Sequence, residues 1–265
     1  HLRSSGGFLG AEKVLTELGR ELPRFGIESI IGVPVDDGVV PELVERCAQL
    51  DIKTQLFPFS SPFNLKDVLA IRRYVREHNI DVIHTHGYRE DIYALALNPR
   101  RVVATNHLWK RTTSKLRVYA AVDAVAMRCF HTLVAVSQPI FDDMRSVKLP
   151  ARKLKLIENG ISLADYSTDF PERAAVRAEL GLQDTDFVFG MVSSLTREKG
   201  HIYALQSLAQ ITQNGYSAHL VIVGDGEDRE QLRLLARQLG VESRVVFAGR
   251  RNDVPRVLQA FSVFL

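Results

Sequence analysis

Apolar residues follow two spacings along the chain, one typical of helices and one typical of buried strands. Helical spacing occurs over residues 11–22, over 66–78 and again from His201 onward. In the first of these stretches we expect the buried face to hold Ala11, Val14, Leu15, Leu18 and Leu22. Short apolar runs with strand character alternate with such stretches: IESIIGV, IDVIHTHG, RVVATN, TLVAVS, LKLIEN, FVFGMV, HLVIVG and RVVFAG. Strands and helices in this alternation predict an α/β protein with doubly wound parallel sheets.

The chain has too many predicted strands for one compact domain, so the pattern predicts two Rossmann-like domains. Strand character gives way to Gly, Ser, Asp and Pro over residues 157–172, before a new helix begins. We expect a first domain over residues 1–166 and a second over residues 167–265.

The pattern also breaks off at both ends. The sequence begins with HLRSSGGFLGAEKVL, a glycine-rich turn that normally follows a strand, and it ends in the apolar run VLQAFSVFL. We expect a piece of a longer protein, with the first strand of the first domain missing and the second domain incomplete.

Composition narrows the class of protein. No apolar run is long enough to predict a spanning helix, and Cys47 and Cys129 are the only cysteines, too few for a disulfide framework. A reducing compartment is therefore expected, namely the cytoplasm or the cytoplasmic face of a membrane. No nucleic acid is expected as a partner.

The net charge of +3 lies in the first part of the chain, where residues 1–150 hold 20 Lys and Arg against 17 Asp and Glu. No carboxylate occurs between Ile92 and Val122, a stretch with six basic residues: Arg100, Arg101, Lys110, Arg111, Lys115 and Arg117. Two interpretations stay open, a solvated face and a surface that contacts an anionic membrane or a phosphate-bearing partner.

Ligands of doubly wound folds bind beyond the carboxyl ends of the strands, so the residues after each strand are site candidates. They are polar here, and they comprise Gly6, Gly7, Glu12, His84, His86, Asn106, His107, Ser137, Asn159, Gly160, Ser193, Ser194, Arg197 and Lys199. Gly6 and Gly7 make either a simple turn or a close approach to a phosphate.

The histidines have a structural and a functional interpretation. His84 and His86 share one strand face and could chelate a metal, but no third ligand of suitable spacing is evident, so no metal is expected. His84 is assigned to the structure, and His86 to the lining of a site. His107 is either a core or surface histidine or a hydrogen-bond donor to a bound hydroxyl or carbonyl.

Arg197 and Lys199 pose a question, because they precede the helix that starts at His201. Cations are unfavourable at a helix start, whereas two cations beside helix amides suit a diphosphate. The alternative is that Lys199 pairs with Glu198 or another acid. Gly224 and Gly226 do not predict a dinucleotide site, because Glu227 and Asp228 follow them and the third glycine is missing.

The ordered motifs together resemble the retaining nucleotide-sugar glycosyltransferases of the GT-B fold, glycosyltransferase family 4. The resemblance runs over essentially the whole chain, through SGGFLGAEKVL, DVIHTHG, LVAVSQPIFDDM, LIENGIS, EKGHIYALQSL and LVIVGDGEDREQLRLLARQLGV to RVVFAGRRNDVPRVLQAFSVFL. It implies that the first domain binds an acceptor and the second a nucleoside-diphosphate sugar in the cleft between them.

The resemblance also implies roles for single residues. Arg197 and Lys199 would neutralise the donor diphosphate, and Gly6 and Gly7 would approach it. His107 would contact the transferred sugar. The remaining candidates are assigned to two groups: Ser193, Gly224 and Gly226 to donor binding, and His86, Asn106, Ser137 and Asn159 to the cleft or the acceptor.

The implied reaction needs no cofactor or metal, and its partners are a nucleotide-sugar donor and a sugar, lipid-linked or other acceptor. It belongs to the synthesis of a cell-surface polysaccharide, lipopolysaccharide or glycolipid. The sequence VSSLTREKG departs from the family's Gly-Arg element, and the family's paired glutamates would lie beyond Leu265. A sugar-nucleotide epimerase, a phosphorylase-like enzyme and a non-catalytic fragment stay open as alternatives.

Overall fold

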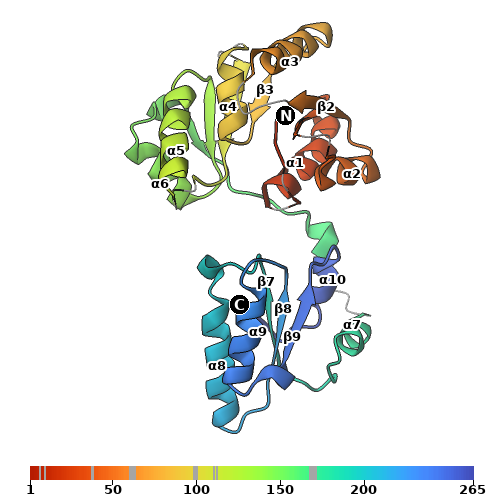
Figure 1. The fold of residues 1–265 in the computed structure, drawn as a ribbon. Helices are drawn as coiled ribbons and strands as arrows, with labels where there is room; N and C mark the ends of the chain where they lie inside the picture. Colours follow the sequence, from red (N-terminus) through yellow and green to blue (C-terminus); the bar gives the residue numbers. More distant parts are fainter. Residues whose placement is uncertain are drawn as a thin grey trace. The chain divides into compact units, whose positions relative to one another are not determined.

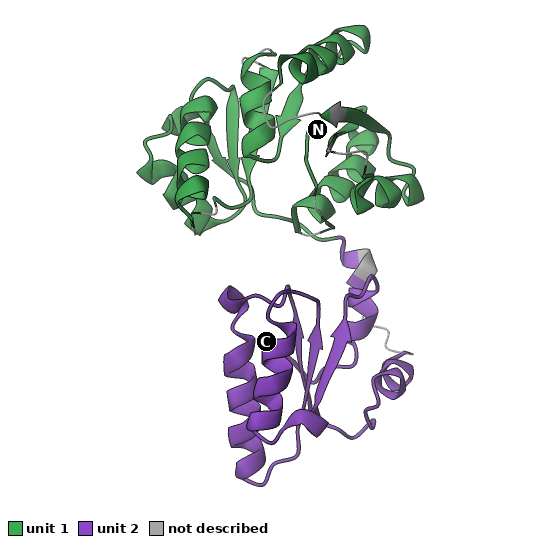
Figure 2. Cartoon of the chain, viewed as in Figure 1, with its two compact units in different colours: residues 1–161 green, residues 162–265 purple. Residues whose placement is uncertain are grey.

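The computed structural model describes residues 1–5, 7–8, 10–36, 39–59, 64–97, 101–109, 111, 113–166 and 172–265. They form two compact units, residues 1–161 and residues 162–265 (Figure 2). The sequence analysis expected the boundary after residue 166. No helix in the described part of the chain is long and apolar enough to cross a membrane.

The strands of unit 1 pair in parallel. They are β1 (Ile31–Asp36), β2 (Thr54–Phe59), β3 (Ile83–Thr85), β4 (Val102–Asn106), β5 (Thr132–Ala135) and β6 (Leu154–Leu156), with β1 beside β2 and with β3 to β6 adjacent in order. Leu2 forms parallel bridges to both Gly32 of β1 and Thr85 of β3. Residues 1–3 therefore lie where the sequence analysis expected a missing first strand, at the point where the strand order reverses.

Helices connect these strands (Figure 1). They are α1 (Gly10–Glu21), α2 (Glu42–Gln49), α3 (Leu65–Glu77), α4 (Tyr88–Leu95), α5 (Ser114–Met127) and α6 (Gln138–Ser146), with 3₁₀ turns η1 (Leu22–Phe25) and η3 (Ala151–Lys153). In α1 the most buried face differs from the expected one, because it holds Glu12, Leu15, Thr16 and Gly19. Gly19 permits this rotation, since a Cβ there would lie 2.9 Å from the Ile52 side chain.

Unit 2 is a second parallel sheet with helices on both faces. Its strands β7 (Val188–Val192), β8 (His219–Val223), β9 (Val245–Gly249) and β10 (Val263–Phe264) lie in the order β10-β7-β8-β9. Helices α8 (His201–Gln213) and α9 (Arg229–Gln238) cover one face, whereas α7 (Arg173–Glu179) and α10 (Val254–Leu258) lie on the other (Figure 1). Its described residues also form the 3₁₀ turns η4 (Leu163–Tyr166), η5 (Arg197–Lys199) and η6 (Glu242–Arg244).

Candidate functional site

In unit 2 the candidate cations lie in the loop that follows β7, the strand at which the order of this sheet reverses. Arg197 and Lys199 belong to the single 3₁₀ turn η5, and Gly200 then adopts a left-handed conformation with φ of 73° before α8 begins. Both side chains are exposed, and neither makes an ion pair with any residue that the structure describes. Two unpaired cations thus precede the first turn of α8, where backbone N–H groups have no partner within the helix.

Gly224 and Gly226 hold the neighbouring loop, which follows β8, tightly against the loop that bears the cations. A Cβ at Gly224 would lie 1.9 Å from the Ser193 carbonyl oxygen, and one at Gly226 would lie 2.3 Å from that of Leu195. The Leu195 amide donates to Asp225 O at 3.0 Å, which ties the two loops together. Only glycine fits at these two positions, so their immediate role is to place the backbone that leads to η5.

Ser193 joins the same loop to the first turn of α8. Its Oγ lies 3.1 Å from Nε2 of His201, a residue that is 2% exposed. Burial lowers the pKa of His201, so this imidazole is neutral at pH 7 and adds no positive charge beside the two exposed cations. Ser193, Gly224 and Gly226 therefore position the cation loop through backbone packing and one side-chain hydrogen bond.

In unit 1 the structure brings His86, Asn106 and His107 together after β3 and β4. They line a pocket of about 220 Å³ whose other walls include Arg3 and Trp109. Nδ1 of His86 lies 3.0 Å from Nε2 of His107. Burial lowers the pKa of His107 to about 4 and that of His86 well below its usual value, with Arg3 contributing to both shifts, so both rings are neutral at pH 7.

The hydrogen bond between the two histidines leaves one nitrogen of His107 for a ligand. When His86 Nδ1–H donates to His107 Nε2, the proton of His107 resides on its Nδ1. A neutral His107 can then donate a hydrogen bond to a hydroxyl or carbonyl oxygen, which is one of the two interpretations that the sequence analysis left open.

Two buried carboxyl groups in this pocket escaped the sequence analysis. Asp91 of α4 and Asp123 of α5 are both 1% exposed, and Asp123 Oδ2 accepts a hydrogen bond of 2.7 Å from Nε1 of Trp109. Burial, followed by the charge of Asp123, raises the pKa of Asp91 well above its usual value, so Asp91 keeps a proton that it can share with Asp123. Asp91 lies within α4 and Asp123 within α5. The search for candidates considered only residues directly after a strand, so it did not select these two.

The other candidates of unit 1 are dispersed. Ser137 precedes α6 and Asn159 follows β6, so both lie at the carboxyl edge of the sheet, but neither lines the pocket of His107. The Gly7 carbonyl accepts a hydrogen bond of 2.7 Å from Ser5 Oγ. Gly6 lies outside the described residues, as do Arg100 and Lys110 of the basic stretch.

Comparisons with known proteins match both units. The family profile described as Glycosyltransferase Family 4 matches residues 9–165, and the profile described as Glycosyl transferases group 1 matches residues 172–265. These two matches follow the division into two units and bear out the resemblance seen in the sequence motifs.

Curated relatives match over much of the chain. It is 26% identical over 215 residues to the UDP-Gal:alpha-D-GlcNAc-diphosphoundecaprenol alpha-1,3-galactosyltransferase of Escherichia coli, an alignment that covers 76% of this chain and 55% of the relative. It is 29% identical over 186 residues to the GDP-mannose-dependent alpha-(1-6)-phosphatidylinositol monomannoside mannosyltransferase of Mycobacterium tuberculosis, with coverage of 68% and 48%. The chain thus spans about half the length of these relatives.

Among solved structures, Anabaena HepE in complex with UDP-glucose resembles the chain with a TM-score of 0.83 and 22% sequence identity. The superposition covers 99% of this chain and 71% of that one. At this identity the likeness shows the fold alone, which is the expected GT-B fold of two Rossmann-like domains.

Proposed function

The chain belongs to glycosyltransferase family 4. We propose that it is part of an enzyme that transfers a sugar from a nucleoside-diphosphate sugar to an acceptor with retention of configuration. The observation that carries this proposal is the pair of exposed, unpaired cations, Arg197 and Lys199, after the first strand of unit 2. The alternative, in which Lys199 merely pairs with Glu198 or another acid, finds no ion pair to Lys199 among the residues that the structure describes.

The two cations act on the leaving group. During transfer the bond between the anomeric carbon and the diphosphate oxygen breaks, and its electron pair goes to that oxygen. The acceptor oxygen bonds to the same face of the anomeric carbon, and its proton passes to the departing diphosphate oxygen. Because negative charge grows on the diphosphate, fixed cations stabilise the transition state more than the ground state. In this mechanism no metal ion is required at the diphosphate.

We assign a second role to His107 in unit 1. As a neutral donor held by His86, it contacts a hydroxyl of the transferred sugar. The polar lining supplied by Asn106 suits hydroxyl groups as well, since Nδ2 of Asn106 has no hydrogen-bond partner in the described structure. Gly6 and Gly7 remain proposed as the segment that approaches the diphosphate, and Ser137 and Asn159 as contacts of the acceptor.

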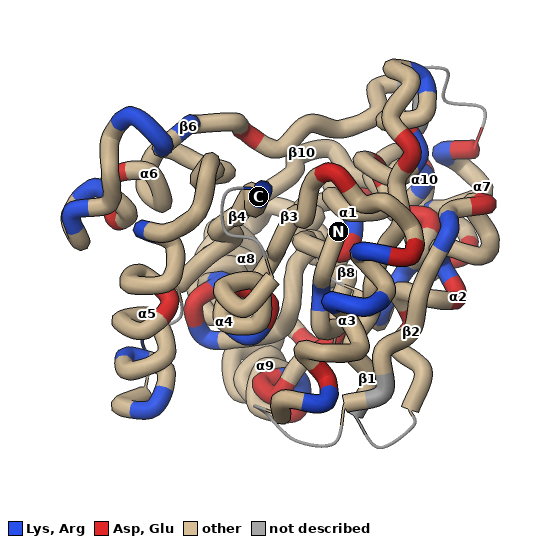
Figure 3. Tube along the Cα trace, turned by 90° about the horizontal axis from the view of Figure 1, so that it is seen from above, with Lys and Arg blue, Asp and Glu red and all other residues tan. Residues whose placement is uncertain are grey.

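A lipid-linked acceptor and a cytoplasmic membrane face are the proposed setting. The two curated relatives described above carry diphosphoundecaprenol and phosphatidylinositol in their names. Exposed apolar side chains, Val118, Val122 and Val125, lie on α5, and Lys115 and Arg117 are exposed in its first turns. Figure 3 shows basic positions at the start of α5 and an acidic position only farther along it. Such a surface suits an anionic bilayer.

The epimerase alternative would need a carboxylate base, and the pocket of His107 does contain two carboxyl groups. Asp91, however, holds its proton because burial raises its pKa, and Asp123 accepts the Trp109 hydrogen bond. A protonated acid is a poor base at neutral pH. The pocket chemistry therefore favours transfer over proton abstraction from a sugar carbon.

The reaction class is tested by incubating the full-length protein with UDP-sugars and GDP-sugars, with and without a lipid-linked acceptor. We expect acceptor-dependent release of a nucleoside diphosphate and a product whose anomeric configuration, read by NMR, equals that of the donor. Conversion of the donor into another nucleotide sugar without release would instead establish the epimerase, and an inverted product would contradict retention.

A further inference from the structure

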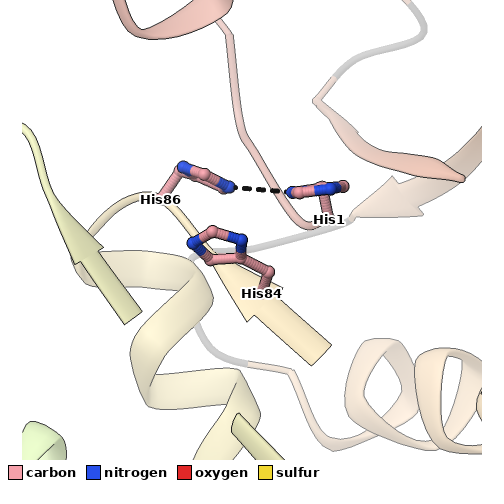
Figure 4. Close-up of side chains that lie close together, drawn as sticks. All are labelled: His1, His84 and His86. Atoms are coloured by element: carbon pink, nitrogen blue, oxygen red, sulfur yellow. Dashed lines mark hydrogen bonds between the residues drawn. The ribbon is translucent and has the colours of Figure 1, made fainter. Parts of the chain in front are cut away.

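Unit 1 contains a cluster of three histidines, of which the proposed transfer reaction uses only His86, as the residue that holds His107. His1 lies in the first segment, whereas His84 belongs to β3 and His86 directly follows it (Figure 4). One nitrogen from each ring lies within 4.8 Å of the others, and Nδ1 of His1 is 3.1 Å from Nε2 of His86. We propose that His1, His84 and His86 bind a divalent transition-metal ion, with Zn²⁺ as the ion that fits best.

The spacing of the three nitrogens is close to that of a zinc site. With Zn–N bonds of about 2.0–2.1 Å and tetrahedral angles, neighbouring ligand nitrogens lie about 3.3 Å apart. The pair His1 and His86 already has this separation at 3.1 Å, and the widest pair, at 4.8 Å at most, must close by about 1.5 Å. Rotations of the side chains suffice for that movement, because His1 and His84 are only partly buried.

The remaining nitrogens of two rings are hydrogen-bonded as metal-bound histidines require. Nε2 of His84 lies 2.7 Å from Thr105 Oγ1, and Nδ1 of His86 lies 3.0 Å from Nε2 of His107. When the ring N–H donates to each of these outer partners, the other ring nitrogen keeps its lone pair free for a metal ion. Partners of this kind fix the tautomer and orientation of metal-bound imidazoles.

Charge around the cluster also permits a cation. Arg3 is the nearby cation, since its guanidinium donates to the His86 carbonyl, but its charge is offset by an ion pair with Glu12 at 2.8 Å. A second acid, Glu90, accepts hydrogen bonds from Ser4 in the same segment.

The choice of metal follows from the ligands. Three imidazoles favour Zn²⁺, Co²⁺, Ni²⁺ or Cu²⁺ and disfavour Mg²⁺ and Ca²⁺, which take oxygen ligands. Three protein ligands leave one position of a tetrahedral ion for water or another ligand. Because the ligands come from the first segment, from β3 and from the residue after it, a bound ion would link the first segment to β3 where Leu2 bridges to Thr85.

The site is tested on the full-length protein, purified without a histidine tag and stripped with a chelator. Calorimetric titration with ZnCl₂ is expected to show one ion per chain with a dissociation constant below about 1 μM, and CoCl₂ is expected to produce the visible absorption of four-coordinate cobalt. Zinc should also raise the melting temperature, whereas MgCl₂ should leave it unchanged.

Matched variants connect the binding to the cluster. His84→Gln should weaken zinc binding at least tenfold, and His131→Gln, which changes an exposed histidine of the same unit, should leave it unchanged. If His84→Gln does not fold, His1→Gln supplies the same comparison at the start of the chain. The proposal is overturned if the stripped protein binds no stoichiometric zinc, or if the ligand variants bind it as tightly as the wild type.

Discussion

Gly226→Ala is expected to impair sugar transfer more than it impairs folding. A Cβ at this position would lie 2.3 Å from the Leu195 carbonyl oxygen, and real Cβ contacts essentially never fall below 3.0 Å. The clash is with backbone, so residues 193–199 must move as a segment by about 0.7 Å or more. That segment carries both proposed diphosphate ligands.

The magnitude follows from the size of this shift. Misplacement of a binding group by about 1 Å costs on the order of 100-fold in rate, so we expect kcat/KM to fall by about 10- to 100-fold. Overpacking should lower the free energy of unfolding by about 1–3 kcal/mol. The measurements are steady-state transfer kinetics of the full-length protein and urea unfolding.

Gly240→Ala provides the control, because Gly240 has φ of 70° and open space around its Cβ position. An alanine there has the strain of a left-handed backbone, about 1–2 kcal/mol, but moves no site residue. Its kcat/KM should match the wild type. If Gly226→Ala and Gly240→Ala lost equal stability and both kept full activity, the inferred coupling between the two loops of unit 2 would be wrong.

Three further predictions concern other parts of the molecule. Asp91 is protonated when folded but ionised when unfolded above its ordinary pKa of 3.8, so its stability contribution falls as pH rises. Asp91→Asn should therefore stabilise the protein at pH 7 and much less at pH 4 in urea unfolding, and an equal effect at both pH values would contradict the assignment. Arg177 is 1% exposed and donates hydrogen bonds to the carbonyls of Ala260, Gln183, Asp184 and Asp186. In chemical denaturation, Arg177→Met should therefore lower the free energy of unfolding by about 3 kcal/mol or more, and Arg173→Met by less than about 1 kcal/mol. Reversing the charges of Lys115 and Arg117 to Glu should reduce sedimentation with phosphatidylserine vesicles about tenfold or more while Arg152→Glu does not, and unchanged sedimentation would remove the membrane proposal.

Much of the fold follows from the sequence because apolar spacing reports secondary structure directly. Each run with strand character overlaps a strand of a parallel sheet, although β2 was not among the expected strands. HLR at the start occupies the place of the first strand that was expected to be missing. The prediction of which face of α1 is buried was wrong. Glu12 is buried against Arg3 and Gly19 against Ile52, and helical periodicity does not encode these contacts.

The candidate site was predictable only where its residues follow a strand. This rule found His86, Asn106 and His107 in unit 1 and the cations of unit 2. It missed Asp91 and Asp123, which reach the same pocket from within helices, and it did not pair His1 with His84 and His86, because that contact joins segments 83 or more residues apart. Partnerships of this kind arise from tertiary structure and leave no local signal.

Nucleoside-diphosphate binding by the Lys199→Ala variant tests the central claim most directly. We expect the dissociation constant of UDP or GDP, whichever the full-length protein binds, to rise about 10- to 100-fold by calorimetry, since a charge-assisted contact contributes about 1.5–3 kcal/mol. The melting temperature without ligand should stay level or rise slightly, because an unpaired cation leaves the start of α8. Arg237→Ala, which removes another exposed cation of unit 2 that pairs with Glu242, should bind normally. Unchanged affinity in Lys199→Ala would contradict the assignment of this loop to the donor diphosphate.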